Sequence, residues 1–142
     1  MLRHGPIALM LHGILEYVAM VVCLLAPFLL DIDSAAGRAT CLAAAAGFLL
    51  VALTNDGPAA LVRRIPVTVH VALDYALAAV LIVAPFALGF ADDDAARNFL
   101  VTVGVLHALM TMGTRFVSPS RPHVGSLAAG TSAKLEAERA GR

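Results

Sequence analysis

The sequence has few charged residues and no tryptophan. Only 14% of its 142 residues are charged, 6% are aromatic, and the formal net charge is zero. Soluble domains typically carry about 25% charged and about 45–50% apolar residues, whereas 60% of this chain is hydrophobic. Because a neutral chain has no basic field with which to hold nucleic acid, we expect no nucleic-acid partner.

The chain also lacks several motifs on which common enzymes depend. It contains no Gly-rich phosphate loop and no Cys-x-x-Cys pair, and its two cysteines, Cys23 and Cys41, lie apart in apolar segments. On two antiparallel helices the axial positions of these cysteines would differ by about 6 Å, which disfavours a disulfide. We therefore expect both cysteines to be small packing residues, and we expect the protein not to be an enzyme.

What the chain has instead is four hydrophobic blocks, at residues 7–30, 39–54, 67–90 and 99–114. A hydrocarbon core of about 30 Å requires roughly 20 helical residues. The first and third blocks reach this length, and we expect residues 35–38 to extend the second block and residues 115–117 the fourth. The sequence thus predicts an all-α membrane protein whose four transmembrane helices form two tandem helical hairpins in the lipid bilayer.

Turn and breaker residues divide the chain into four parts. The first hairpin covers residues 1–54, and the second covers residues 67–117. The linker between them, residues 55–66, begins with the turn signal Asn-Asp-Gly-Pro. Residues 118–142 begin with the helix-breaking string Ser-Pro-Ser-Arg-Pro and have no apolar face, so we expect them to form a flexible cytoplasmic tail.

The basic residues are distributed unevenly between the two sides of the predicted bundle. Eight of the ten lie in the N-terminal segment, the linker or the C-terminal segment: Arg3, Arg63, Arg64, Arg115, Arg121, Lys134, Arg139 and Arg142. Only Arg38 and Arg97 lie in the other two loops. Lys and Arg accumulate on the cytoplasmic side of membrane proteins. We therefore expect a multi-pass protein of the cytoplasmic (inner) membrane with both termini in the cytoplasm.

The two hairpins are related by an internal repeat. Residues 12–30 and 70–88 share eight identities in nineteen positions, including the His, the Tyr and an Ala-Pro-Phe string. Arg38 and Arg97 also correspond if one residue is inserted. Because each copy contains two spans, the copies have the same orientation, which predicts a pseudo-two-fold axis along the membrane normal. Pro27 and Pro85, at equivalent positions, are expected to kink their helices near the outer end.

The residues from Leu73 to Phe90, with Ala84-Pro85-Phe86 among them, resemble the bacterial SPW-repeat membrane proteins, which are named for a Ser-Pro-Trp motif. In this chain alanine replaces the serine and phenylalanine replaces the tryptophan in both copies. The resemblance implies two helical pairs over residues 8–117, with the motif near the outer end of each first helix. It implies this architecture and no particular reaction.

A few polar side chains lie inside the hydrophobic blocks. Glu16 and Asp74 are the only two of the ten acidic residues there, and a carboxyl group in hydrocarbon usually marks a polar contact or a site. A histidine precedes each by four residues, so each pair shares one helix face, and His107 is expected at the same membrane depth. The candidate intramembrane site comprises His12, Glu16, Tyr17, His70, Asp74, Tyr75 and His107.

Three interpretations of this site compete. The polar groups form hydrogen bonds that fix the bundle, or they form a proton or cation pathway, or they bind a divalent metal or a haem. The first is favoured, because the outward half of the long helices is apolar and the His-x-x-x-acid spacing is not specific for metals. We therefore expect a non-catalytic accessory subunit or scaffold without a cofactor, which associates with a membrane-protein partner or with a second copy of itself. A small proton or cation transporter, or a metal-binding or haem-binding redox subunit, is the alternative.

Overall fold

The computed structural model describes residues 5–54 and 66–116 of the chain. Four helices form this part of the protein: α1 (Leu9–Leu29), α2 (Ala35–Thr54), α3 (Val67–Ala87) and α4 (Asp94–Gly113). Each is long and apolar enough to cross a membrane. The predicted all-α membrane class is therefore confirmed. Almost all of the predicted linker, and the whole predicted tail, lie outside the described residues.

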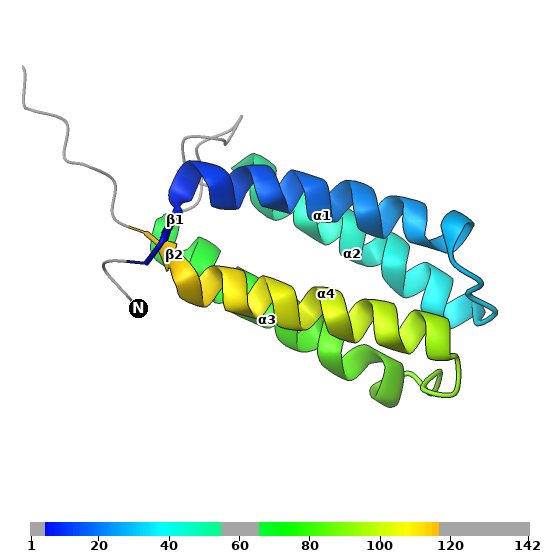
Figure 1. Ribbon diagram of the computed structural model, residues 1–142. Helices are drawn as coiled ribbons and strands as arrows, with labels where there is room; N and C mark the ends of the chain where they lie inside the picture. Colours follow the sequence, from blue (N-terminus) through cyan, green and yellow to red (C-terminus); the bar gives the residue numbers. More distant parts are fainter. Residues whose placement is uncertain (1–4, 55–65, 117–142) are drawn as a thin grey trace, which may run out of the picture.

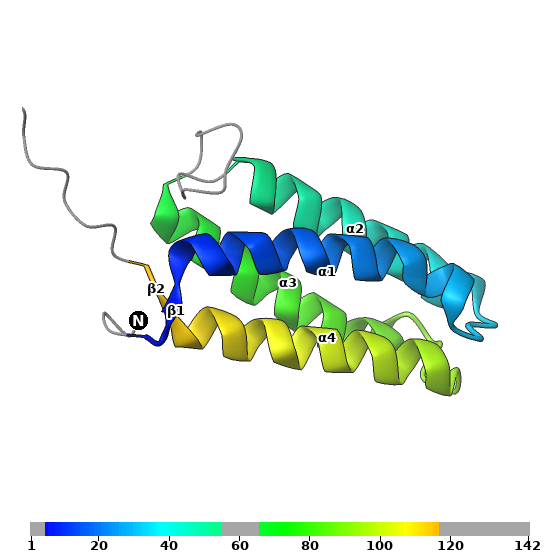
Figure 2. The ribbon, with the colours of Figure 1, turned by 45° about the horizontal axis from the view of Figure 1, so that its top comes forward.

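The helices are arranged as two antiparallel hairpins side by side (Figures 1 and 2). α1 packs mainly against α2, and α3 packs mainly against α4. The loops within the hairpins lie together at one end of the bundle, here called the loop end. At the opposite end, the strand end, β1 (Ile7–Ala8) pairs in parallel with β2 (Thr114–Arg115).

The strand pair changes the boundaries expected for two helices. α1 begins at Leu9 rather than at residue 7, and α4 ends at Gly113 instead of continuing to residue 117. The pairing takes Thr114 out of the helix. Gly5 lies directly against Gly113, and a Cβ atom at position 5 would overlap the carbonyl oxygen of Gly113. α4 is extended at its other end instead, where Asp93 caps the helix.

The two loops at the loop end repeat the same contact. Nη1 of Arg38 donates to the carbonyl oxygen of Ile32 at 2.7 Å, and Nη1 of Arg97 donates to the carbonyl oxygen of Ala91 at 2.7 Å. Arg97 stands 59 positions after Arg38, and Ala91 stands 59 positions after Ile32. This fits the alignment of the two arginines. The internal repeat therefore extends from the long helices into the loops.

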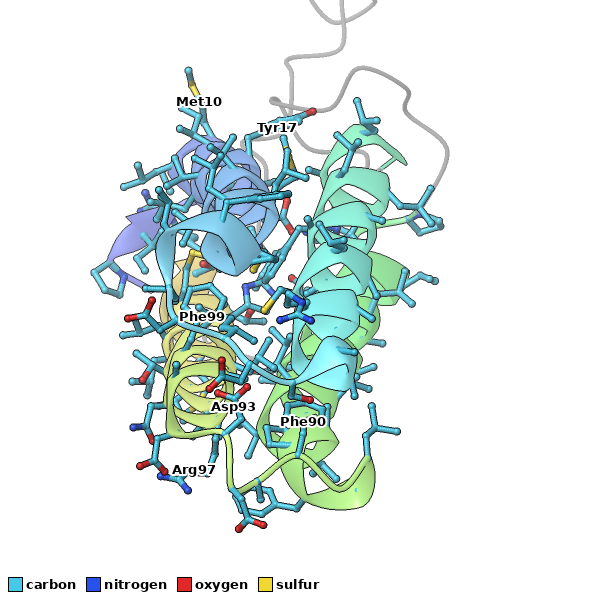
Figure 3. The ribbon with its side chains drawn as sticks, turned by 90° about the vertical axis from the view of Figure 1, so that its right-hand side faces the viewer. Met10, Tyr17, Phe90, Asp93, Arg97 and Phe99 are labelled. Carbon is cyan, nitrogen blue, oxygen red and sulfur yellow. The ribbon has the colours of Figure 1, made fainter. Side chains whose placement is uncertain are left out.

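Asp93 joins the two hairpins at the loop end, where it is labelled in Figure 3. Its Oδ1 accepts a hydrogen bond from the backbone N–H of Ala96 at 3.0 Å, which caps α4. Its Oδ2 accepts from the backbone N–H of Ser34 in the other hairpin, at 2.8 Å. These N–H donors, with that of Ala96 the strongest, stabilise the carboxylate and hold the pKa of Asp93 below its usual value.

Replacing Asp93 with alanine is expected to lower the free energy of unfolding by about 1 kcal/mol at neutral pH, the usual cost of losing a helix cap. Folding lowers the pKa of Asp93. Its contribution to the free energy of unfolding is therefore fully present above the ordinary Asp pKa of about 3.9. That contribution is lost as the pH falls through the lower pKa of the folded state. Unfolding by denaturant in detergent, at pH 7 and at pH 3, measures this. Asp92→Ala, on an exposed neighbour, is the control, and equal losses in the two variants would contradict the capping role.

The core toward the loop end is apolar. Cys23 and Cys41 are both fully buried there with free thiols, and they pack in one cluster with Phe48, Leu81 and Leu100. The lipid-facing surface of the bundle is lined by exposed aliphatic and aromatic side chains, which suits a hydrocarbon environment. α1 and α3 each end two residues after their proline. A tight cluster of polar residues lies between this core and the strand end.

Candidate functional site

Four polar side chains from α1 and α3 meet inside the bundle. His12 and Glu16 lie one turn apart on α1, and His70 and Asp74 lie one turn apart on α3. All four side chains are at least 98% buried. One nitrogen or carboxylate oxygen from each lies within 4.8 Å of the others. The internal repeat thus brings one His and one acid from each hairpin to a common centre.

The four groups form a closed ring in which nitrogen and oxygen alternate. Nε2 of His12 lies 3.2 Å from Oδ2 of Asp74 and 3.6 Å from Oε1 of Glu16. Nε2 of His70 lies 3.4 Å from each of the same two oxygens. Each histidine therefore contacts the acid of its own helix and the acid of the other hairpin. The ring connects the two hairpins through four contacts of similar length.

These contacts are at ion-pair distances, and none has the geometry of an aligned hydrogen bond. Within the described residues, Nε2 of both histidines and the carboxylate oxygens of Glu16 and Asp74 are buried without a hydrogen-bond partner. Leaving a buried polar atom unpaired costs about 1–3 kcal/mol, so each such atom in a folded protein requires an explanation. The four ligand atoms lie within 4.8 Å of one another around one centre, as ligand atoms do around a cation.

The hydrogen-bond network assigns the tautomer of His12. Oγ1 of Thr114 donates its single proton to the carbonyl oxygen of Met110 at 2.6 Å, so at 2.9 Å it accepts from Nδ1–H of His12. In the neutral ring this leaves the lone pair on Nε2, which faces the carboxylates. Histidine ligands of metals typically donate their other N–H to such an outer partner.

Thr114 is a site residue that the sequence analysis missed. It lies 102 positions from His12 in the chain and reaches it through the pairing of β1 with β2. A threonine at the end of an apolar block carries no local signal of this role. Only the tertiary contact reveals it.

His107 of α4 lies beside the ring. Its Nε2 is 3.6 Å from Oδ1 of Asp74, the oxygen that faces away from the two histidines. On its other side, the ring of Phe48 from α2 packs edge-on against it, with centroids 4.9 Å apart. The structure therefore places His107 beside the Asp74 carboxylate.

The two candidate tyrosines are not part of this cluster. Tyr75 is 42% exposed on the outer surface of α3, and Tyr17 lies at the periphery of the bundle, where Figure 3 labels it near Met10. Each follows an acidic residue directly, and successive helical residues point about 100° apart. The structure thus gathers five of the seven candidate residues and leaves the two tyrosines outside.

The ring has the size and charge that suit a divalent metal ion. The four ring contacts measure 3.2–3.6 Å, and all four ligand atoms lie within 4.8 Å of one another, which is close enough for them to surround one small ion at metal–ligand distances of about 2.0–2.2 Å after a small adjustment. Two carboxylates balance the charge of a divalent ion, so the ion and its ligands would be neutral together. This lowers the cost of burying them. Nitrogen and oxygen ligands suit Zn²⁺, Fe²⁺ or Mn²⁺. A haem fits less well, because carboxylate oxygens lie between the two imidazoles.

The chain matches the model of a known family. The family model described as the SPW repeat domain matches residues 10–114, a range that includes all four ring residues, His107 and Thr114. No curated protein and no solved structure matches the chain.

Proposed function

The chain belongs to the SPW repeat domain family, and we propose that it is a non-catalytic membrane subunit whose two hairpins are joined by a divalent metal ion. The ligands are His12, Glu16, His70 and Asp74. One observation carries this proposal: four buried ligand atoms lie within 4.8 Å of one another, and none of them has an aligned hydrogen-bond partner among the described residues.

The arrangement favours a structural ion over a catalytic one. Catalytic zinc sites keep one position open for water or substrate, whereas structural sites take all four ligands from the protein. Here four protein ligands are present, and each is almost fully buried. Because each hairpin supplies one histidine and one acid, an ion at the centre would hold the two halves together. This role is compatible with an accessory subunit or scaffold.

The two other interpretations have less support. A purely hydrogen-bonded contact would align an N–H with each oxygen, and these contacts are not so aligned. A proton or cation pathway needs polar groups across the bilayer. Toward the loop end, however, the described core beyond the ring consists of residues such as Cys23, Leu81 and Leu100. We retain transport as the alternative that flux measurements in liposomes would reveal.

The location and partners of the subunit are also proposals. The excess of basic residues at the termini and in the linker supports a bacterial inner-membrane protein whose strand end faces the cytoplasm. Ala43-x-x-x-Gly47 and Ala72-x-x-x-Ala76 provide small-residue helix faces, which suit close packing with a partner subunit or a second copy. Co-purification from native membranes would identify such a partner.

Metal analysis of the purified protein tests the central proposal. We expect about one Zn²⁺, Fe²⁺ or Mn²⁺ per chain in protein purified in mild detergent without chelators. Chelator-stripped protein should take up one equivalent when titrated with each ion. The absorption spectrum of the same sample would reveal any haem. A folded sample that contains no metal and binds none during titration would overturn the proposal.

A further inference from the structure

His107 is a buried polar residue that the four proposed ligands do not account for. It lies on α4, and neither of its ring nitrogens has an aligned hydrogen-bond partner among the described residues. Its Nε2 lies 3.6 Å from Oδ1 of Asp74, whereas Oδ2 of Asp74 belongs to the ring. A carboxylate that binds a metal is typically hydrogen-bonded in turn to an outer residue. His107 is in the place that such an outer residue would occupy.

The gap between these two atoms is slightly longer than a hydrogen bond. Nε2 of His107 and Oδ1 of Asp74 are 3.6 Å apart, so they must approach by about half an ångström to reach the usual N–H···O distance. A small rotation of either side chain about its χ angles supplies this approach. Oδ1 would then accept a hydrogen bond from His107 and leave Oδ2 for the ion, which fixes the orientation of the carboxylate.

The internal repeat shows that packing does not require a histidine at this position. With the offset of 59 residues that relates the loops, His107 corresponds to Phe48 of α2, and the two rings pack edge-on with centroids 4.9 Å apart. α2 packs against α1, which carries Glu16, so the neighbour equivalent to His107 in that hairpin is an apolar ring. The fold accepts phenylalanine there, and the imidazole therefore requires a reason beyond packing.

The C-terminal end of α4 already supports the ring at a second point. Thr114, which caps this end, accepts the Nδ1–H of His12 at 2.9 Å. His107 lies seven residues earlier, which is about two helical turns, so both residues are on the same face of α4. The ligands that they contact, His12 and Asp74, belong to different hairpins and make the shortest of the four ring contacts, at 3.2 Å. One helix thus reaches one ligand of each hairpin.

We propose that His107 is a positioning residue of the metal site, which donates a hydrogen bond to Asp74 and holds this ligand in the orientation that binds the ion. The inference rests on the proposed function, because it assigns an outer partner to a proposed ligand. It adds that α4, which contributes none of the four ligands, determines how tightly the ion is held. Without the imidazole the Asp74 carboxylate could rotate freely, and ordering it again when the ion binds would lower the affinity.

Zn²⁺ binding by variants at position 107 tests this proposal. His107→Phe introduces the residue of the equivalent position, and it should weaken Zn²⁺ binding about 10–100-fold, the usual loss when an outer partner is removed. His107→Gln keeps an N–H donor near the position of Nε2, and its affinity should lie closer to that of the wild type. Competition with a chelator of known affinity, in detergent, measures Zn²⁺ binding by the wild type and both variants.

Two further measurements separate positioning from a general role in folding. Metal-free His107→Phe should unfold at no lower denaturant concentration than the metal-free wild type, because an apolar ring replaces a buried unpaired polar group. The visible absorption of bound Co²⁺ depends on the arrangement of its ligands. It should change in His107→Phe and be largely restored in His107→Gln. Phe48→Leu is the matched control, since it removes the ring packed against His107 and should leave the Zn²⁺ affinity unchanged.

The wild type distinguishes a failure of this inference from a failure of the proposed function. A wild type that binds none of Zn²⁺, Fe²⁺, Mn²⁺ and Co²⁺ overturns the proposed function and, with it, the role of His107. A wild type that binds Zn²⁺ no more tightly than His107→Phe does overturns the role of His107 alone. Equal losses in the two His107 variants, or in His107→Phe and Phe48→Leu, would also overturn it, because the loss would then not depend on the donated hydrogen bond.

Discussion

Asp74→Asn is expected to reduce the affinity for the divalent ion at least 100-fold and to lower the metal content of the purified protein to below about one tenth of an equivalent. Removing even an outer hydrogen-bond partner of a metal ligand typically lowers the metal affinity 10–100-fold. Asp74→Asn removes the charge of a ligand itself. The ring would then hold one carboxylate in place of two, so the divalent charge would be only half balanced. Titration against a chelator of known affinity measures the loss.

Two comparisons make this result specific. Asp92→Asn is the same substitution at an exposed position of the loop, and it should leave the metal affinity unchanged. Adding the ion at 100 times its dissociation constant should stabilise the wild type by about 2.7 kcal/mol, with little effect on Asp74→Asn. A wild type whose unfolding does not respond to any of the three ions would favour the purely hydrogen-bonded interpretation of the ring.

Gly104→Ala is expected to destabilise the bundle by about 1–3 kcal/mol, the usual cost of overpacking a core. A Cβ atom at this position would lie 2.9 Å from the carbonyl oxygen of Ala78 and 2.8 Å from Cγ1 of Ile82. The first of these is backbone, so α3 and α4 would have to move apart. Alanine favours the helical conformation over glycine by up to about 1 kcal/mol. The energetic cost of the clash should exceed this gain. Denaturant unfolding in detergent measures the difference.

Gly47→Ala is the matched control for this prediction. At Gly47 the nearest atom to an added Cβ would be Cδ1 of Leu77, at 3.4 Å, which is an ordinary contact distance. The substitution should therefore be neutral or stabilising, because only the helix preference changes. Equal effects at the two glycines would show that the close approach of α3 to α4 at Gly104 does not limit the stability of the bundle.

The sequence predicted most of the architecture, because the bilayer leaves few choices. Four apolar blocks of helical length in a chain with little charge lead to four spanning helices. The boundaries were less predictable. The sequence did not indicate that Thr114 would leave α4 to pair with Ile7, because a two-residue pairing across the whole chain has no local pattern.

The candidate site was also largely visible in the sequence. A carboxyl group in an apolar block is unusual, and its spacing of four from a histidine places both on one helix face. Glu16, Asp74 and His107 could thus be assigned to one depth. Tyr17 and Tyr75 were included because they follow the acids directly in both copies, but helical geometry turns them toward the periphery, and Tyr75 is well exposed there.

By itself, then, the sequence determined the spans, the repeat and the polar residues, since all three depend on hydrophobicity and on spacing along one helix. Only the tertiary structure decided that the four polar side chains form one ring, which atoms face its centre, and that Thr114 orients His12. These features depend on the position of α1 relative to α3 in the bundle, and on the pairing of β1 with β2 at the strand end. Contacts between helices are set by side-chain packing in three dimensions, and no periodicity within one helix encodes them.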